Sequence, residues 1–439
     1  MTTNAASPLA EAAAAAGCPF RPDFDPFDDP YLSDPYSWLA EARSQSPIFY
    51  SPEIDYFVVT RYEDIRNIFR NPEVFSPSPT TEPMTPPWPS TMEEFAKWGR
   101  AIQYVTGPTL VNEDEPEHMM RRRRITPPFL PKTVALLEEH VREYTTDYID
   151  RFVKRGHADL VDDFVWEIPV RVLFRLMGVP DEDAHYVKEF TAERALFSWG
   201  RPSEEVQNRM AGEVGAFAQY CERHIARLRE KLGDDVTSTL IRFSDEDPEL
   251  FPELMVHSYL LNFMFAGHET TTSGSASGFI NLLQDRKQWQ MVCEDRSLIP
   301  NAIEEILRFN PPINAWHRRA LKATQVGDIA IPEGARLLLV IGSANRDPDR
   351  FPDPDRFDIT RPDAKFHLSF GVGNHTCLGA PVARLEMRVF LEELTRRLPH
   401  LELVPDQQFE FSPNASFRGP RHVLATWDPS QNPLPQDRP

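Results

Sequence analysis

A short stretch with the sequence FGVGNHTCLG, residues 370–379, contains the side chain best suited to metal chemistry, Cys377. Glycine is frequent in this stretch, and it permits the tight turns and close backbone approach that a flat ligand needs. A helix-like pattern follows over residues 378–398, and a helix N-terminus stabilises negative charge on a nearby sulfur. Most single cysteines are small buried hydrophobic residues. The loop setting favours another interpretation, in which the Cys377 thiolate ligates a metal and backbone N–H groups of the turn hydrogen-bond it.

Two adjacent polar residues, Glu269 and Thr270, lie inside an unusually long helical pattern that runs from Pro252 to about residue 283. A threonine within a helix often donates a hydrogen bond to the carbonyl four residues earlier, here Ala266, and this alone would explain Thr270. It would not explain a neighbouring carboxylate, because burying an unpaired charge is costly. The pair therefore predicts a functional acid beside a hydroxyl.

Length, charge and cysteine content limit the class of protein. The chain has 439 residues, a formal net charge of −20 and four scattered cysteines without a CxxC pair. The charge disfavours nucleic acid and anionic membranes as partners, and the cysteine spacing disfavours a zinc site or an iron–sulfur cluster. Such cysteine usage fits a reducing cytoplasm, which we expect as the location. The longest uncharged apolar-rich run, residues 254–267, is too short for a bilayer span, which needs about 20 apolar residues.

The order of the periodic segments predicts a mainly α protein with a small β-rich region. Residues 47–60 alternate apolar and polar positions, which indicates a hairpin, and residues 313–331 are also typical of strands. Amphipathic helix patterns dominate the remainder. No linker divides the middle of the chain, so we expect one domain over residues 26–428. A flexible tail would precede it over residues 1–25, and a C-terminal linker would start at residues 429–439.

The spacing Phe370-x-x-Gly373-x-His375-x-Cys377-x-Gly379 resembles the haem-binding loop of the cytochrome P-450 superfamily. The resemblance extends over nearly the whole chain. It implies the family's mainly α fold, shaped as a triangular prism, with haem b between the long central helix and the Cys377 loop. It also implies that Cys377 is the axial iron ligand, that Phe370 and Gly379 contact the haem, and that His375 binds a propionate.

The same resemblance assigns Glu269 and Thr270 to the acid–alcohol pair on the family's oxygen-facing helix, with glutamate where aspartate is commoner. Thr270 would hydrogen-bond the bound dioxygen. Glu269 would deliver protons from water, so that the O–O bond breaks heterolytically. Ala266 and Gly267, one turn earlier, would border the open sixth position of the iron.

Basic residues in two further segments match the family's propionate-binding positions. His118 and Arg122 are four residues apart and would share one helical face, from which they could clamp a propionate by charge-assisted hydrogen bonds. Arg318 matches a second propionate-binding arginine. The alternative for the basic run around Arg122 is a solvated face or a docking patch for a redox protein.

Glu305 and Arg308, three residues apart on a predicted helix, match the family's Glu-x-x-Arg core pair, and Arg356 in the segment FPDPDRF matches its arginine partner. We expect these three residues to be structural, so that Glu305→Ala gives protein without haem. The resemblance implies that the substrate side is lined by Ala266, Asn314, Ala315, Trp316 and Ala415.

Several stretches, among them YSPEIDYFVVTRYEDI, resemble the haem domain of self-sufficient bacterial members, in which haem, a flavin mononucleotide reductase and a two-iron ferredoxin share one polypeptide. In such enzymes electrons pass from NAD(P)H through the FMN and 2Fe-2S centres, and this chain contains neither segment. We expect either an excised haem domain or a stand-alone relative that uses separate redox partners, and we expect a monomer.

The predicted reaction is insertion of one oxygen atom from O2 into a C–H bond of a small hydrophobic, aromatic substrate, by hydroxylation or O-dealkylation. Thiolate donation to the haem iron favours O–O cleavage. One alternative is a peroxygenase driven by hydrogen peroxide, and another is a haem-binding sensor without turnover. The pair Glu269 and Thr270 favours the O2 route, because peroxide already brings its protons and electrons and a sensor needs no such pair.

Overall fold

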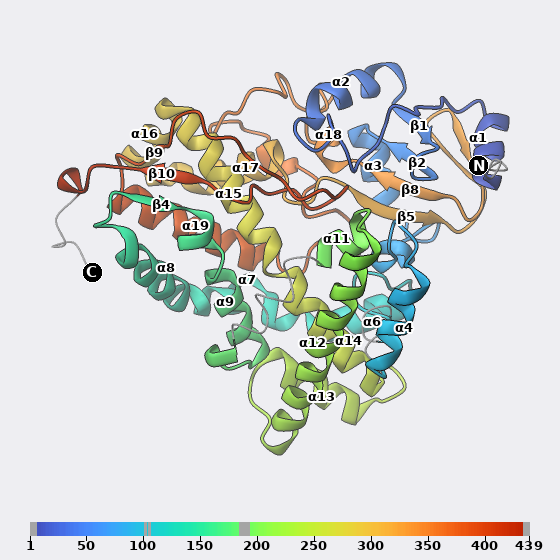
Figure 1. Ribbon diagram of the computed structural model, residues 1–439, viewed down its shortest axis with the longest axis horizontal. Coiled ribbons are helices and arrows are strands. Elements are labelled where there is room, and N and C mark those ends of the chain that lie inside the picture. Colours follow the sequence, from blue (N-terminus) through green and yellow to red (C-terminus); the bar gives the residue numbers. More distant parts are fainter. Residues whose placement is uncertain (1–6, 101–102, 104–106, 184–193, 433–439) are drawn as a thin grey trace.

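The computed structural model describes residues 7–100, 103, 107–183 and 194–432. Its outline in Figure 1 is roughly triangular, with the main sheet and the N-terminus in one corner and helices over the rest. The predicted mainly α architecture with a small β-rich region is confirmed.

The main sheet has five strands in the order β1-β2-β8-β5-β3. β1 and β2 form the predicted antiparallel hairpin, in which Tyr50 pairs with Phe57. β2 runs parallel to β8, whereas β8 and β3 are both antiparallel to β5. The five strands are β1 (Ile48–Ser51), β2 (Tyr56–Val59), β3 (Phe75–Ser76), β5 (Trp316–Ala320) and β8 (Arg336–Leu339).

Two smaller sheets complete the β structure of the described residues. One has the order β4-β10-β9 and joins the middle of the chain to its C-terminal part, and the other is the pair β6-β7. The short strands after β5 agree with the prediction for residues 313–331. Their bounds are β4 (His157–Asp159), β6 (Thr324–Val326), β7 (Ile329–Ile331), β9 (Glu402–Leu403) and β10 (Leu424–Thr426).

Helices of the first half begin at residues that suit a helix start. Asp34 and Ser203 accept hydrogen bonds from the first free N–H groups of α2 and α12, which stabilises those ends. The helices are α1 (Pro8–Ala15), α2 (Pro35–Gln45), α3 (Tyr62–Phe69), α4 (Pro89–Lys97), α6 (Glu117–Ile125), α7 (Pro131–Val134), α8 (Glu138–Phe152), α9 (Ile168–Met177), α11 (Arg194–Trp199) and α12 (Glu204–Glu230).

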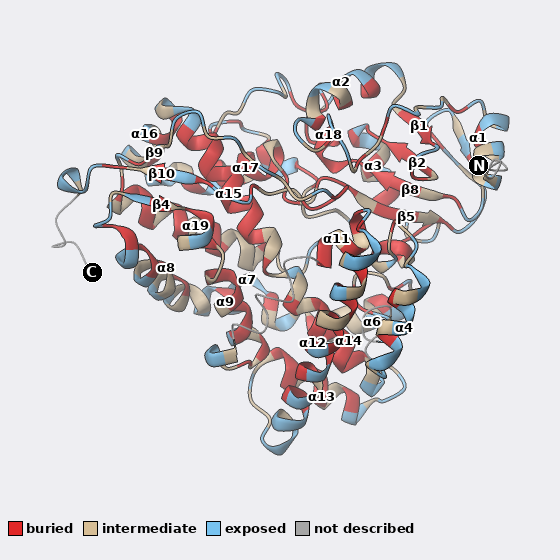
Figure 2. Cartoon of the chain, in the orientation of Figure 1, coloured by how far each residue is buried: buried red, intermediate tan, exposed pale blue. Residues whose placement is uncertain are grey.

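The second half supplies the helices through the centre of the molecule. α14 and α15 follow one another across the middle in Figure 1, and Figure 2 shows buried residues along much of their length. α15 packs against α17 and α19, and α19 also packs against α8. The bounds are α13 (Val236–Glu246), α14 (Glu253–Ala266), α15 (Glu269–Gln284), α16 (Arg286–Glu294), α17 (Ile299–Phe309), α18 (Ile341–Ala344) and α19 (Ala380–Arg397).

The structure corrects the prediction of a flexible N-terminal tail over residues 1–25. Within the described part of that segment, α1 places Ala13 in the core cluster of the main sheet, and Cys18 is also buried there. The backbone of Arg21 donates to Tyr50, next to β1. Ala13, with Leu9 and Ala10 beside it, buries apolar surface against the sheet, which fixes the segment. The first six residues lie outside the described part of the chain.

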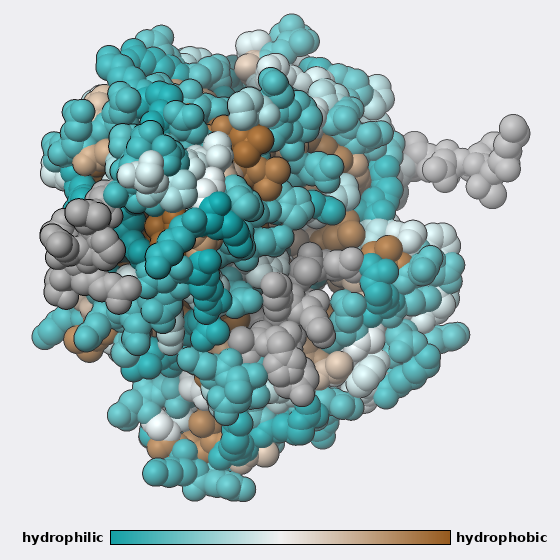
Figure 3. Space-filling model, turned by 60° about the vertical axis from the view of Figure 1, so that its left-hand side comes forward, coloured by the Kyte–Doolittle hydropathy of each residue, from teal (hydrophilic) through white to brown (hydrophobic). Residues whose placement is uncertain are grey.

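At the C-terminal end, residues 429–431 form a short 3-10 turn, and the side chain of Asn432 donates to the carbonyl of Val153 at 3.2 Å. The remainder of the predicted linker lies outside the described residues. The surface seen in Figure 3 is largely hydrophilic, with separate apolar patches. Among the described helices, none combines the length and the apolar character that crossing a membrane requires.

Candidate active site around Cys377

The Cys377 loop folds as its glycines predict. Gly371 and Gly373 have φ angles of 65° and 86°, in the left-handed region that glycine adopts without strain. A Cβ atom on Gly373 would also lie 3.0 Å from the carbonyl oxygen of Phe69. The Cys377 N–H donates to the Phe370 carbonyl at 2.7 Å, which closes the loop just before α19.

The sulfur of Cys377 lies at the N-terminus of α19. The backbone N–H groups of Gly379 and Ala380 are near enough to this sulfur to lower the pKa of its thiol. Burial raises the pKa of the Cys377 thiol, while those two N–H groups and the charge of Arg122 act in the opposite direction. These donors stabilise a thiolate, which is the form that binds metals.

The same loop borders the middle of the central helices. Leu378, beside Cys377, packs against the cluster that contains Met264 of α14 and Leu173 of α9. Ala266 is exposed although it ends a largely buried helix, and Cys377 is exposed as well. Solvent-accessible surface therefore reaches both the end of α14 and the sulfur, deep within the fold.

The break between α14 and α15 carries the predicted acid and alcohol. Gly267 and His268 separate the two helices, and His268 is held by its Nε2 atom, 2.9 Å from the Trp166 carbonyl. The Thr270 hydroxyl donates to the Ala266 carbonyl at 3.0 Å, the local hydrogen bond expected of a helical threonine. Oε2 of Glu269 is enclosed and has no hydrogen-bond partner. Burial raises the pKa of Glu269 to about 8.

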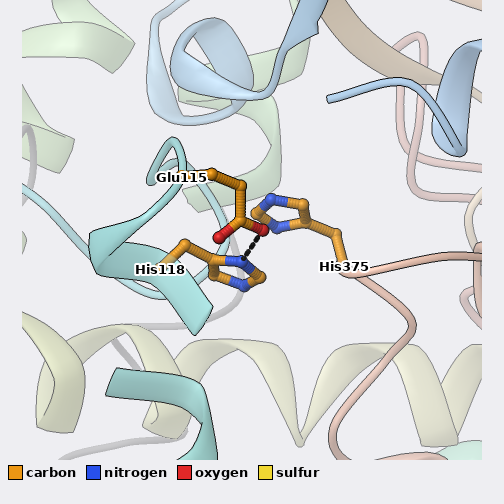
Figure 4. Close-up of side chains that lie close together, drawn as sticks. All are labelled: Glu115, His118 and His375. Carbon is orange, nitrogen blue, oxygen red and sulfur yellow. Dashed lines mark hydrogen bonds and ion pairs between the residues drawn. The ribbon is translucent and has the colours of Figure 1, made fainter. Parts of the chain in front are cut away.

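Three side chains meet where α6 approaches the Cys377 loop (Figure 4). The rings of His118 and His375 stack with centroids 3.7 Å apart, and Glu115 hydrogen-bonds Nδ1 of His118 at 3.1 Å. The Nε2 atoms of both histidines are buried and lack partners. Burial, followed by the neighbouring His118, Arg318 and Arg122, lowers the pKa of His375 to about 2.

The two predicted basic side chains lie around this histidine pair. Arg122 donates through Nη2 to the Thr376 carbonyl, between His375 and Cys377. Arg318 is almost fully buried in β5, where it donates to the His317 carbonyl at 2.7 Å and lies over the ring of Phe69. Burial lowers the pKa of Arg318 to about 9. The four predicted basic residues thus converge on one side of the loop.

One of the three residues predicted to form the Glu305 structural cluster is wrong. Glu305 and Arg308 are fully buried and form a bidentate pair, with N···O distances of 2.7 and 2.8 Å. The third partner is Arg361, whose Nε lies 3.2 Å from Glu305, and not Arg356. Arg356 contributes only its backbone carbonyl, which accepts from both Arg308 and Arg361.

The side chain of Arg356 points away from that pair and is 71% exposed. It lies on the rim of a groove of about 520 Å³ that is also lined by Asn281, Gln288 and Phe357. None of the groove residues belongs to the Cys377 loop. Asp353 has a positive φ of 47°, and its carbonyl accepts a hydrogen bond from Nη2 of Arg361 at 2.9 Å, which helps to hold Arg361 beside Glu305.

The structure exposes only some of the residues that were predicted to line the substrate side. Asn314, Ala315 and Ala415 expose 1%, 0% and 0% of their surface, so they lie behind the accessible wall instead of on it. Main-chain and side-chain hydrogen bonds around Ser416 bury them together. Trp316 is partly exposed and stacks on Trp199 with ring centroids 5.1 Å apart.

Sequence reasoning missed three residues near the site. Glu115 contacts the histidine pair, and Arg194 of α11 donates to Asn262 of α14 at 2.7 Å. Glu386 of α19 is a buried carboxyl whose pKa, like that of Glu269, is raised by burial to about 8, although a hydrogen bond with Thr271 acts in the opposite direction. A carboxylate in an otherwise apolar helical stripe was the available signal for Glu386; no periodicity marks the other two.

Known proteins resemble this chain over nearly its full length. A sequence model of the family described as Cytochrome P450 matches residues 92–422. Cytochrome P450 107B1 of Saccharopolyspora erythraea is 32% identical over 398 residues, which cover 89% of this chain and 95% of the relative.

Solved structures extend the likeness to the fold. An intact type IV self-sufficient cytochrome P450 monooxygenase superposes with a TM-score of 0.92 at 44% identity, covering 99% of this chain and 56% of that one. Cytochrome P450 CREJ in complex with (4-ethylphenyl) dihydrogen phosphate has a TM-score of 0.87 at 35% identity, covering 92% of this chain and 99% of that one. The chain therefore belongs to the cytochrome P450 family and is a P450 monooxygenase, as the Cys377 loop predicted.

Proposed function

We propose that this monooxygenase inserts one oxygen atom from O2 into a C–H bond of a small hydrophobic, aromatic substrate, by hydroxylation or O-dealkylation. Cys377 is the axial ligand of a haem b in this proposal. The observation that carries it is the exposed Cys377 at the N-terminus of α19, where the backbone N–H groups of Gly379 and Ala380 favour the thiolate. The other three cysteines lack this setting, because Cys18 and Cys221 are buried and Cys293, which is partly exposed, lies near the C-terminal end of α16.

The residues of the site fit a haem. Its two propionates need buried cationic or donor groups, and the unpartnered Nε2 atoms of His118 and His375 lie beside Arg122 and Arg318. In the proposal these four side chains hold the propionates. The small residues Ala266 and Gly267 leave room for a flat ring next to α14. A bound haem supplies the activation of O2, and thiolate ligation favours O–O cleavage.

Glu269 and Thr270 manage protons in this proposal. With a pKa of about 8, the Glu269 carboxyl holds its proton at neutral pH and can release it from Oε2, which no protein group occupies. Solvent that reaches Ala266 returns the proton. The Thr270 hydroxyl, anchored on the Ala266 carbonyl, positions an oxygen lone pair next to this route. Positioned proton transfer contributes about 10²- to 10⁴-fold in rate.

Aromatic side chains support an aromatic substrate. Trp316 stacks on Trp199, and Phe265, next to Ala266, packs on Phe417 with centroids 5.4 Å apart. Aromatic rings prefer offset or edge contacts with such a wall. The 35% identical CREJ protein was solved with a 4-ethylphenyl phosphate, which also contains a benzene ring.

Electrons come from NAD(P)H through FMN and a 2Fe-2S centre in this proposal. The support is the 44% identity with a self-sufficient enzyme that is longer than this chain. The redox centres can be fused to the haem domain or carried by separate proteins. Four free cysteines, none in a CxxC pair, favour a cytoplasmic location.

The ligand assignment is tested on haem-loaded protein by the carbon monoxide difference spectrum of the reduced form. We expect the band of a thiolate-ligated haem for the wild type and for Cys293→Ala, a matched cysteine away from the loop. Cys377→Ala should lose that band. An unchanged spectrum for Cys377→Ala would remove the basis of the proposal.

The reaction is tested with a panel of aryl alkyl ethers and alkylbenzenes in two arms. One arm contains NADH and an FMN/2Fe-2S reductase under O2, and the other contains hydrogen peroxide alone. We expect phenol or alcohol products in the first arm. Steady product in the peroxide arm only would identify a peroxygenase, and no product in either arm would favour a haem-binding sensor.

A further inference from the structure

Glu115 links two segments that meet beside the Cys377 loop (Figure 4). Its Oε1 atom accepts hydrogen bonds from Nδ1 of His118 at 3.1 Å and from Nδ2 of Asn374 at 2.7 Å. Its Oε2 atom accepts from the backbone N–H of Met119 at 3.1 Å. One carboxylate therefore joins the start of α6 to a loop residue that is 259 positions away in the sequence.

The contacts of Glu115 are part of a series of contacts between the α6 segment and the loop before Cys377. His118 stacks on His375, and Arg122 donates to the carbonyl of Thr376. Glu115 lies just before α6, and His118 and Arg122 are four residues apart on it. These three residues meet the consecutive loop residues 374, 375 and 376 in order. Glu115 and Arg122 thus bracket the histidine pair at its two ends.

Glu115 also fixes how His118 presents its ring. In the bond to Glu115, Nδ1 of His118 carries the proton and donates it, because an ionised carboxylate only accepts. The opposite atom, Nε2, is buried and has no partner in the protein. To donate to a propionate, Nε2 must carry a proton as well, so His118 would act there as an imidazolium that donates from both nitrogens. Burial lowers the pKa of His118, whereas the bond to Glu115 raises it, and a second carboxylate at Nε2 would favour the charged ring further.

The ionised state of Glu115 follows from its contacts. Burial alone would raise the pKa of Glu115, but hydrogen bonds from His118, Asn374 and Met119 and the charge of His118 hold it below the ordinary value. The side chain is 22% exposed, so the carboxylate stays partly in contact with water. A negative charge is therefore present behind His118 at neutral pH.

We propose that Glu115 is a positioning residue for the haem, which orients His118 toward a propionate, anchors Asn374 and places a negative charge near the cofactor edge. The inference rests on the proposed haem site. It adds a residue that touches no cofactor and acts through His118 and the loop. Two consequences follow: Glu115 slows haem loss, and its charge lowers the reduction potential of the bound haem.

The test compares purified haem-loaded wild type, Glu115→Ala, Glu115→Gln and Glu117→Gln. Glu117 is exposed at the start of α6 and provides the same loss of charge without a contact to His118. One readout is the rate of haem transfer to an excess of apomyoglobin, and the other is the midpoint potential by anaerobic dye titration. Neither depends on catalytic turnover.

We expect Glu115→Ala to lose haem about 10-fold faster than the wild type, in line with the usual effect of removing an outer partner of a binding histidine. Glutamine keeps an oxygen acceptor but not the charge. Glu115→Gln should therefore retain haem nearly as well as the wild type while its midpoint potential becomes more positive. Glu117→Gln should match the wild type in both readouts.

Two results would overturn the inference. Glu115→Ala with the wild-type transfer rate would show that Glu115 does not position the site. An equal potential shift in Glu115→Gln and Glu117→Gln would show only a general effect of surface charge. The carbon monoxide spectrum of the wild type separates these results from a failure of the haem site itself, because a wild type without a thiolate-type band would fail at the Cys377 assignment first.

Discussion

Glu305 and Glu269 are both glutamates enclosed within helices, and their surroundings are opposite. Glu305 of α17 accepts hydrogen bonds from Arg308, Arg361 and the backbone of Asp358. Glu269 at the start of α15 has an Oε2 atom without any partner, and burial raises its pKa to about 8. One carboxylate is fully compensated, whereas the other is kept neutral.

The difference shows that partners, more than burial, decide whether an enclosed carboxyl is ionised. A buried charge is stable only when opposite charges and hydrogen bonds replace water. Glu305 meets that condition in the frame behind the Cys377 loop. Glu269 does not, so its proton remains available at neutral pH, which is what a proton donor needs.

The largest expected effect is on the compensated carboxylate. Glu305→Ala leaves the buried Arg308 without its counter-charge, and breaking a buried pair costs about 3–5 kcal/mol. We expect a matching loss in the free energy of unfolding by urea, together with purified protein that contains little haem. Wild-type haem content in this variant would contradict the comparison.

The uncompensated carboxylate should behave in the opposite way. Glu269→Gln keeps the size of the side chain but removes the proton donor, so we expect product formation to fall about 10²-fold. The urea midpoint at neutral pH should stay the same or rise, because no buried pair is broken. The measurements are product formed per O2 consumed and the unfolding curve; unchanged turnover would refute the proton-donor role.

Variants of Arg361 and Arg356 test which arginine is the partner of Glu305. Arg361→Ala removes one donor to Glu305 while Arg308 remains, so a loss of about 1.5–3 kcal/mol in unfolding free energy is expected. Arg356→Ala is the matched control and should change stability by no more than about 0.5 kcal/mol, since its side chain is largely exposed. Equal losses in the two variants would restore Arg356 as the partner.

The remaining prediction concerns the pH dependence of stability. The folded pKa of Glu269, about 8, lies above its ordinary value of 4.5, so between these values the folded protein binds the extra proton. Stability should therefore fall as pH rises from about 5 to 8, by up to about 1.4 kcal/mol per pH unit from this group. Glu269→Gln should show a flatter dependence in urea unfolding at pH 5 and pH 8.

The pH profile of Glu269→Gln must be compared with that of the wild type, because Glu386 also titrates. Burial raises its pKa to about 8 as well, so it contributes to the same pH window. Both proteins retain Glu386, and the difference between their pH profiles isolates Glu269. Identical profiles would mean that the Glu269 carboxyl is ionised in the folded protein.

Local patterns predicted the elements that depend on neighbouring residues in the chain. The alternation in residues 47–60 predicted the hairpin of β1 and β2, and the glycines of the Cys377 loop predicted its turns. The helical period predicted one long helix from Pro252 to about residue 283, which the structure divides into α14 and α15 at residues 267 and 268. Short-range sterics and hydrogen bonds decide such features, so the sequence carries them directly.

Contacts between distant segments were predicted less well. Arg356 and Arg361 are five residues apart and chemically identical, and only the course of the chain after Asp353 decides which one reaches Glu305. Likewise, Ala315 and Ala415 have the right size for a substrate wall, but the packing around Ser416 buries them.

The sequence by itself determined the family, the mainly α fold and the position of the cysteine before a helix, because these depend on spacing along one segment. Tertiary structure alone decided which polar side chains are paired with a partner and which have none. Glu115 meets Asn374, and Glu305 meets Arg361, across long stretches of chain. Compensation of a buried charge depends on distance in space, and spacing in sequence does not encode that distance.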